Sequence, residues 1–102
     1  MLNMLTIVGR VKGLEINEEE SVNGKTRNFI ELKVPRNFKN EMGEYEADYI
    51  RVETLGLAMR EALDMIKPGD LLGIKGRVMS ESDSKIMHVV AEKITLLKSA
   101  NE

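Results

Sequence analysis

The segment from Arg27 to Leu55 most constrains the fold, because it holds two stretches in which apolar and polar residues alternate. Apolar residues occupy every second position: Ile30, Leu32 and Val34 in the first stretch, Ile50 and Val52 in the second. A period of two places one row of side chains against a core and the other in water. Residues 36–48 between them are polar, and Asn40 and Gly43 favour a turn there. The sequence therefore predicts a long hairpin of two strands joined by a polar connection.

The remaining segments supply three further strands and one helix. Strands are expected over residues 4–14, 70–79 and 85–97, and a helix over residues 56–67. Gly9 and Gly13 lie inside the first of these strands, where glycines mark a bulge or a sharp bend. The joining segments are polar, namely residues 15–26 with their run Glu18–Glu20, and residues 80–84. Both are expected to be solvated loops.

The helix carries an apolar stripe suited to closing a barrel. The stripe consists of Leu55, Met59, Ala62, Leu63 and Ile66. Three strands, one helix and two strands predict an all-β OB-fold, a five-stranded Greek-key barrel with one α-helix between strands 3 and 4. We expect residues 1–98 to form this domain and residues 99–102 to be a short frayed tail.

Composition narrows the class of function. The chain has no cysteine, which excludes a disulfide framework and a thiolate metal site. No apolar run is long enough to span a membrane and no signal peptide opens the chain, so a cytoplasmic location is expected. The net charge is −2, so any nucleic-acid binding must depend on a local basic patch.

Residues that could carry catalysis are scarce. His88 stands in the last strand beside Val89 and Val90, without a cysteine or a pair of carboxylates nearby in the sequence. Gly73 and Gly76 are close to Lys75, but they lie inside a predicted strand and not before a helix, so they form no phosphate-binding loop. We therefore expect neither an enzyme nor a cofactor.

Basic residues alternate with the core positions of several predicted strands. They are Arg10 and Lys12, Lys33, Arg36 and Lys39, Arg51, and Lys75 and Arg77. One interpretation is an ordinary solvated exterior. The other is a groove that follows a phosphate backbone, with Phe38, Tyr45 and Tyr49 as stacking faces, an arrangement that favours single strands over duplexes. Phe29 is out of phase with Ile30, which places it on this surface or at a subunit contact.

Four segments resemble the bacterial single-stranded DNA-binding protein family. They are MLNMLTIVGRV, FKNEMGEYEADYIRV, KPGDLLGIKGRV and HVVAEKITLL, in this order along nearly the whole chain. The resemblance implies an OB-fold that assembles into homotetramers or sometimes dimers. It also implies sequence-independent binding of single-stranded DNA in replication, repair and recombination, at the nucleoid.

The resemblance also suggests roles for individual residues. Phe38 and Tyr49 would stack on bases, and a basic path would follow the phosphates. The candidate DNA-binding residues are Arg10, Lys12, Lys33, Arg36, Phe38, Lys39, Tyr49, Arg51, Leu55, Lys75 and Arg77. The chain departs from the family where Leu55 replaces a common aromatic residue, and it has no tryptophan. Glu53 is expected to face outward and repel DNA.

The sequence is compatible with two alternative functions. The chain ends at KSANE without the acidic tip of the family, which indicates either a truncated protein or a tailless relative. A tailless relative would act mainly as a protein-interaction or primosome accessory module that contacts replication or repair proteins and binds DNA weakly. An RNA-binding barrel is the second alternative. The apolar residues 1–4 favour a homo-oligomer in either case, with a tetramer preferred over a dimer.

Overall fold

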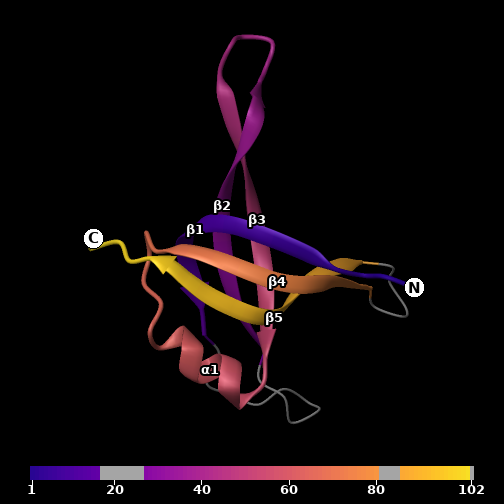
Figure 1. Ribbon diagram of the computed structural model, residues 1–102, viewed down its shortest axis with the longest axis vertical. Helices are drawn as coiled ribbons and strands as arrows, with labels where there is room; N and C mark the ends of the chain where they lie inside the picture. Colours follow the sequence, from indigo (N-terminus) through magenta and orange to yellow (C-terminus); the bar gives the residue numbers. More distant parts are fainter. Residues whose placement is uncertain (17–26, 81–85, 102) are drawn as a thin grey trace.

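The computed structural model describes residues 1–16, 27–80 and 86–101. The elements are β1 (Leu5–Glu15), β2 (Arg27–Lys39), β3 (Tyr45–Leu55), α1 (Leu57–Leu63), β4 (Leu71–Ser80) and β5 (Met87–Lys98). The strands close into a barrel in the order β1-β2-β3-β5-β4, with α1 between β3 and β4 (Figure 1). This arrangement confirms the predicted OB-fold. The predicted solvation of residues 18–20 and most of the turn at 80–84 lie outside the described residues.

β1 is shared between two walls of the barrel. Its first half pairs with β4, up to Arg10 opposite Leu71, and its second half pairs with β2, from Arg10 opposite Lys33 onward. The register with β2 shifts between Val11 and Gly13, which confirms the irregularity expected from the glycines. Arg10 therefore stands where the two walls meet.

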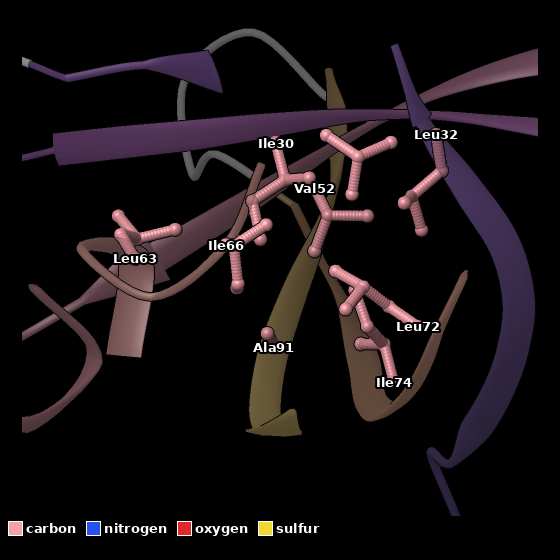
Figure 2. Packing of buried hydrophobic residues seen from close by; sticks show 9 residues of the cluster. Ile30, Leu32, Val52, Leu63, Ile66, Leu72, Ile74 and Ala91 are labelled. Carbon is pink, nitrogen blue, oxygen red and sulfur yellow. The ribbon is translucent and has the colours of Figure 1, made fainter. Parts of the chain in front are cut away.

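The core follows the alternation in the strands. It consists of Val11, Ile30, Leu32, Val52, Leu63, Ile66, Leu72, Ile74 and Ala91 (Figure 2). Leu63 comes from α1 and Ile66 from the turn after it, so two of the five residues of the predicted stripe reach the core. Leu55, another of the five, is the last residue of β3 and lies outside the helix. α1 lies at one end of the barrel, and the β2–β3 hairpin projects from the opposite end (Figure 1).

The helix is shorter than the sequence predicts. It ends at Leu63 and not at residue 67. The next three backbone N–H groups, of Asp64, Met65 and Ile66, donate to the carbonyl oxygen three residues earlier, at 3.1–3.2 Å. Bonds over three residues wind the chain more tightly than an α-helix, and they still turn Ile66 into the core.

The two strands of the hairpin are longer, and their connection is shorter, than the sequence predicts. Residues 36–48 are not a polar connection, because β2 continues to Lys39 and β3 begins at Tyr45. Only the turn at residues 40–44 joins them, where the Asn40 Oδ1 accepts from the backbone N–H groups of Met42 and Glu44, both at 2.9 Å. Beyond the barrel neither face meets a core, so the apolar alternation stops while the backbone ladder goes on.

Asp70 joins three parts of the chain at the start of β4. Its carboxylate accepts from the backbone N–H of Lys67 at 2.9 Å and from that of Ala100 at 2.8 Å. Its carbonyl oxygen accepts from the backbone N–H of Val11. The hydrogen bonds from Ala100 and then Lys67 hold the pKa of the Asp70 carboxyl below its usual value of 3.8.

We expect Asp70→Asn to lower the melting temperature at pH 7 by on the order of 5 °C, because the amide offers only one acceptor oxygen. A lowered carboxyl pKa stabilises the fold above the ordinary pKa of 3.8, and this contribution disappears as the pH falls through the folded-state pKa. The gap between the two proteins should therefore narrow by pH 3 in thermal scans. Glu92→Gln, at an exposed carboxylate of β5, is the control. A gap that does not change with pH would contradict this role.

Candidate nucleic-acid interface

Three cations and one aromatic ring gather on the outer surface of β1, β2 and β3. Arg10 pairs with Lys33, and Lys33 pairs with Tyr49. Lys12 follows Arg10 by two residues and lies on the same surface, with its Nζ 5.9 Å from the centroid of the Tyr49 ring. All four side chains are exposed. We call Arg10, Lys12, Lys33 and Tyr49 the cationic face.

The cations of the cationic face are available for a ligand. Arg10 donates to the carbonyl oxygen of Gly69 at 3.0 Å, which leaves its charge uncompensated. Within residues 1–16, 27–80 and 86–101, no carboxylate forms an ion pair with Arg10, Lys12 or Lys33. The cationic face therefore carries three positive charges beside one aromatic ring.

Arg51 lies on the same outer surface, nearer the end of β3 than Tyr49, and its environment differs from that of the cationic face. Its guanidinium carbon lies 3.6 Å from the centroid of the Phe29 ring, and its Nη2 donates to the Glu15 Oε2 at 2.7 Å. These groups line a hollow of about 170 Å³ together with Gly13, Leu14 and Glu31. Phe29 is only 8% exposed, so the aromatic ring predicted at the surface is there but is covered by arginine.

Glu53 lies on the outer side of β3, as predicted, but its carboxylate is not open to solvent. Glu53 is 6% exposed, and its carboxylate forms an ion pair with Arg27, which precedes Phe29 on β2 by two residues. Strand periodicity gives the side of the sheet on which a residue lies. It does not show which residue of the neighbouring strand covers it, and Arg27 does so here.

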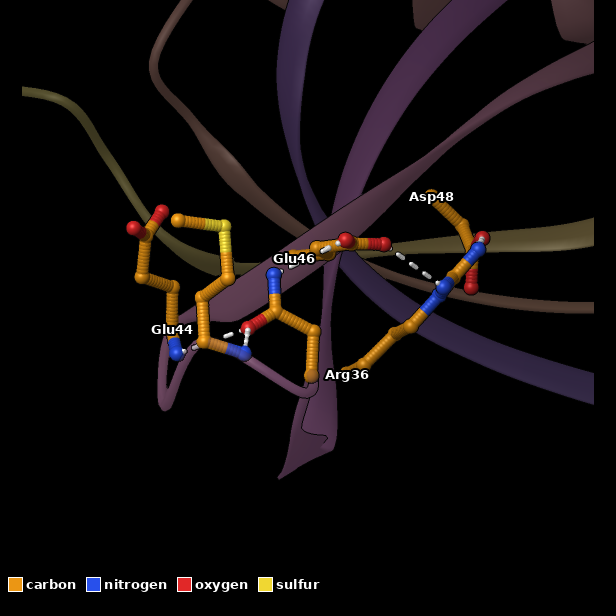
Figure 3. Close-up of polar contacts among 6 residues, drawn as sticks. Arg36, Glu44, Glu46 and Asp48 are labelled. Atoms are coloured by element: carbon orange, nitrogen blue, oxygen red, sulfur yellow. Dashed lines mark hydrogen bonds and ion pairs between the residues drawn. The ribbon is translucent and has the colours of Figure 1, made fainter.

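The projecting hairpin carries the remaining aromatic candidates. Phe38 and Tyr45 are each about two-thirds exposed, and the Lys39 Nζ lies 5.7 Å from the centroid of the Tyr45 ring. Arg36 donates to Asp48 at 2.8 Å and to Glu46 at 3.0 Å (Figure 3). The hydrogen bond with Asp48 raises the pKa of Arg36 and lowers that of Asp48. Two carboxylates thus compensate the charge of Arg36.

The other candidates lie apart from the cationic face. Lys75 pairs with Thr6 on β1, four residues from Arg10, or roughly 13 Å along the strand. Lys75 and Arg77 therefore lie on the β1–β4–β5 wall, where Lys75 is also opposite Lys93. Leu55 is partly exposed at the far end of β3.

The structure therefore divides the predicted residues into separate groups. Sequence reasoning did not include Phe29 or Lys93 among the candidates. For Lys93 the sequence held no separate signal, because only the β4–β5 register places it next to Lys75. For Phe29 the sequence did hold a signal, because it alternates with the core residue Ile30 and therefore lies on the outer side of β2.

A small OB-fold barrel with cations and aromatic rings on its outer surface belongs to the class of oligonucleotide-binding barrels. The model of the single-strand binding protein family matches residues 2–97. The chain therefore belongs to the single-strand binding protein family.

One relative supports this assignment by its sequence, and two solved structures share the fold. The chain is 35% identical to single-stranded DNA-binding protein 3 of Streptococcus agalactiae over 99% of its own length and 78% of that protein. The crystal structure of the single-stranded DNA-binding protein of Thermus aquaticus has a TM-score of 0.75 at 22% identity, with 98% of this chain and 52% of that one covered. The dimeric N-terminal domain of PriB from Thermoanaerobacter tencongensis has a TM-score of 0.65 at 23% identity, covering 95% and 98%.

Within the part of the chain that the structure describes, no helix could cross a membrane.

Proposed function

We propose that this chain binds single-stranded DNA without sequence preference. The observation that carries the proposal is the cationic face, where three cations without a carboxylate partner among the described residues share one surface with the exposed Tyr49. The family and the name of the Streptococcus agalactiae relative support the same ligand. The assignment is to a family of binding proteins and not to a family of enzymes.

Phosphates and bases would use different parts of the surface. Arg10, Lys12 and Lys33 would neutralise phosphates and release counterions, which gives affinity without sequence information. Tyr49, with Phe38 on the hairpin, would stack on unpaired bases, a contact of ~1–3 kcal/mol per base that every base can make. Duplex DNA offers no exposed base faces to these rings, so it should compete poorly.

The cellular role and the assembly are part of the same proposal. We infer that the chain acts in replication, recombination and repair as a homo-oligomer, with a tetramer favoured and a dimer possible. Met1, Leu2 and Met4 are exposed beside β4, where Asn3 exchanges two hydrogen bonds with the backbone of Val78, at 2.6 and 3.0 Å. Apolar side chains on a segment held in this way suit a contact with a second copy.

A second candidate is a protein-interaction or primosome accessory module that binds DNA weakly. The similarity to PriB over nearly both whole chains favours it. So does the compensation of Arg36 and Arg51 by carboxylates, which leaves fewer cations for phosphate.

Fluorescence anisotropy with a labelled oligo-dT of about 35 nucleotides tests the proposal. We expect tight binding that weakens steeply with salt and that duplex DNA does not displace, because phosphates and unpaired bases are both needed. RNA of the same length serves as a second competitor. Absence of binding at low salt would reject DNA binding and favour the accessory module.

A further inference from the structure

Arg51 presents a planar cation at the surface of the barrel. Its guanidinium stacks on the Phe29 ring on one side, and Glu15 holds its edge. The Arg51 side chain is still 57% exposed, so the side of the guanidinium away from the ring is open to solvent. Arginine stacks on aromatic faces in this way because its charge is delocalised over a plane.

The charge around Arg51 does not suit a phosphate. Glu15, Glu31 and Glu53 stand against Arg27 and Arg51, so carboxylates outnumber guanidinium groups among the described residues here. A phosphate brought to this place would meet net negative charge. A nucleobase is neutral, and its π face is attracted to a planar cation.

We propose that Arg51 and Phe29 form a composite stacking platform for one unpaired base. Arg51 contacts the base, and Phe29 is a positioning residue that holds the guanidinium flat. This inference rests on the proposed binding of single-stranded DNA, and it names a contact separate from the cationic face.

The platform stands next to a partly exposed apolar residue, Leu55, at the end of β3. Leu55 pairs with Arg27, and Phe29 follows Arg27 by two residues on the same side of β2. Phe29 and Leu55 are therefore diagonal neighbours, within reach of one base. A base on the Arg51 guanidinium could therefore extend over the apolar side chain of Leu55.

The test compares two strands of equal length, oligo-dT and an abasic strand with the same phosphates. Arg51→Lys keeps the positive charge but removes the planar guanidinium group. We expect it to bind oligo-dT about tenfold more weakly, and to bind the abasic strand as wild type does, with the salt dependence unchanged. Phe29→Leu should give the same pattern, and Phe29→Tyr, which keeps a ring, should match wild type.

Lys33→Gln is the contrasting variant. Loss of a phosphate contact should weaken the binding of both strands and flatten the salt dependence.

Melting curves establish that each variant is folded. If Phe29→Leu does not fold, Arg51→Lys and Phe29→Tyr complete the test. Equal loss on both strands in Arg51→Lys would make Arg51 a phosphate contact and overturn the platform, as would unchanged affinity for oligo-dT. If the wild-type protein binds neither strand, both the proposed function and this inference are overturned. If the wild-type protein binds oligo-dT and Arg51→Lys binds it equally well, only the inference is overturned.

Discussion

Replacement of Arg10, Lys12 and Lys33 together by glutamine should weaken binding of single-stranded DNA about 100-fold at 0.1 M salt. Each residue is exposed and lacks a carboxylate partner among the described residues, so each can release a counterion when it binds a phosphate. Three lost contacts should also lower the slope of log K against log salt by about 2, since a single strand loses roughly 0.7 per phosphate contact. Anisotropy titrations of oligo-dT at four salt concentrations measure both quantities.

The matched control removes three charges from the other wall of the barrel, with Lys75, Arg77 and Lys93 replaced by glutamine. These residues are exposed on β4 and β5, away from Tyr49. We expect a smaller loss of affinity, because β1, β4 and β5 contain no Phe, Tyr or Trp that could stack on a base. If the control triple loses more affinity than the first triple, the DNA follows the β1–β4–β5 wall instead of the cationic face.

Gly76→Ala should destabilise the barrel by more than ~3 kcal/mol and leave much of the protein unfolded. A Cβ at residue 76 would lie 2.1 Å from the carbonyl oxygen of Val90 and 3.1 Å from its carbonyl carbon. These are backbone atoms of the paired strand, so they cannot turn away as a side chain can. The β4–β5 register shifts between Lys75 and Gly76, and the close approach occurs at this shift.

Gly13→Ala is the matched control for this prediction. Gly13 also lies at a register shift in a strand, but a Cβ there would meet nothing within 4 Å, and its φ is not positive. We expect a change of less than about 0.5 kcal/mol in either direction. Urea unfolding followed by circular dichroism measures both variants. Equal stability of the two would show that the strands can separate at residue 76 at little cost.

Local pattern was sufficient for the order and kind of the elements. Alternation placed Ile30, Leu32 and Val52 in the core, and the glycines of β1 predicted its irregularity. These features depend on the period of a strand and on the freedom of glycine, which are properties of neighbouring residues. The same period correctly turned the cations outward, as their exposure shows.

Local pattern was not sufficient where an element has no core to face. The hairpin beyond the barrel is held by cross-strand backbone bonds and by Arg36 with its carboxylates, so its sequence does not alternate in the way that a half-buried strand does. The end of α1 was missed for a different reason, because a change from four-residue to three-residue hydrogen bonds ends the helix while the apolar pattern continues to the buried Ile66.

The amino-acid pattern was enough to predict a small barrel with an apolar interior and a charged exterior, because the side of a sheet on which a residue lies follows from its position along the strand. Which charges stand together was decided by the tertiary structure alone. The cross-strand register places Arg10 opposite Lys33. It also brings Glu53 close enough to Arg27, and Glu15 close enough to Arg51, for each to form an ion pair. Register joins residues far apart in the chain, and a shift of one position would exchange every one of these neighbours.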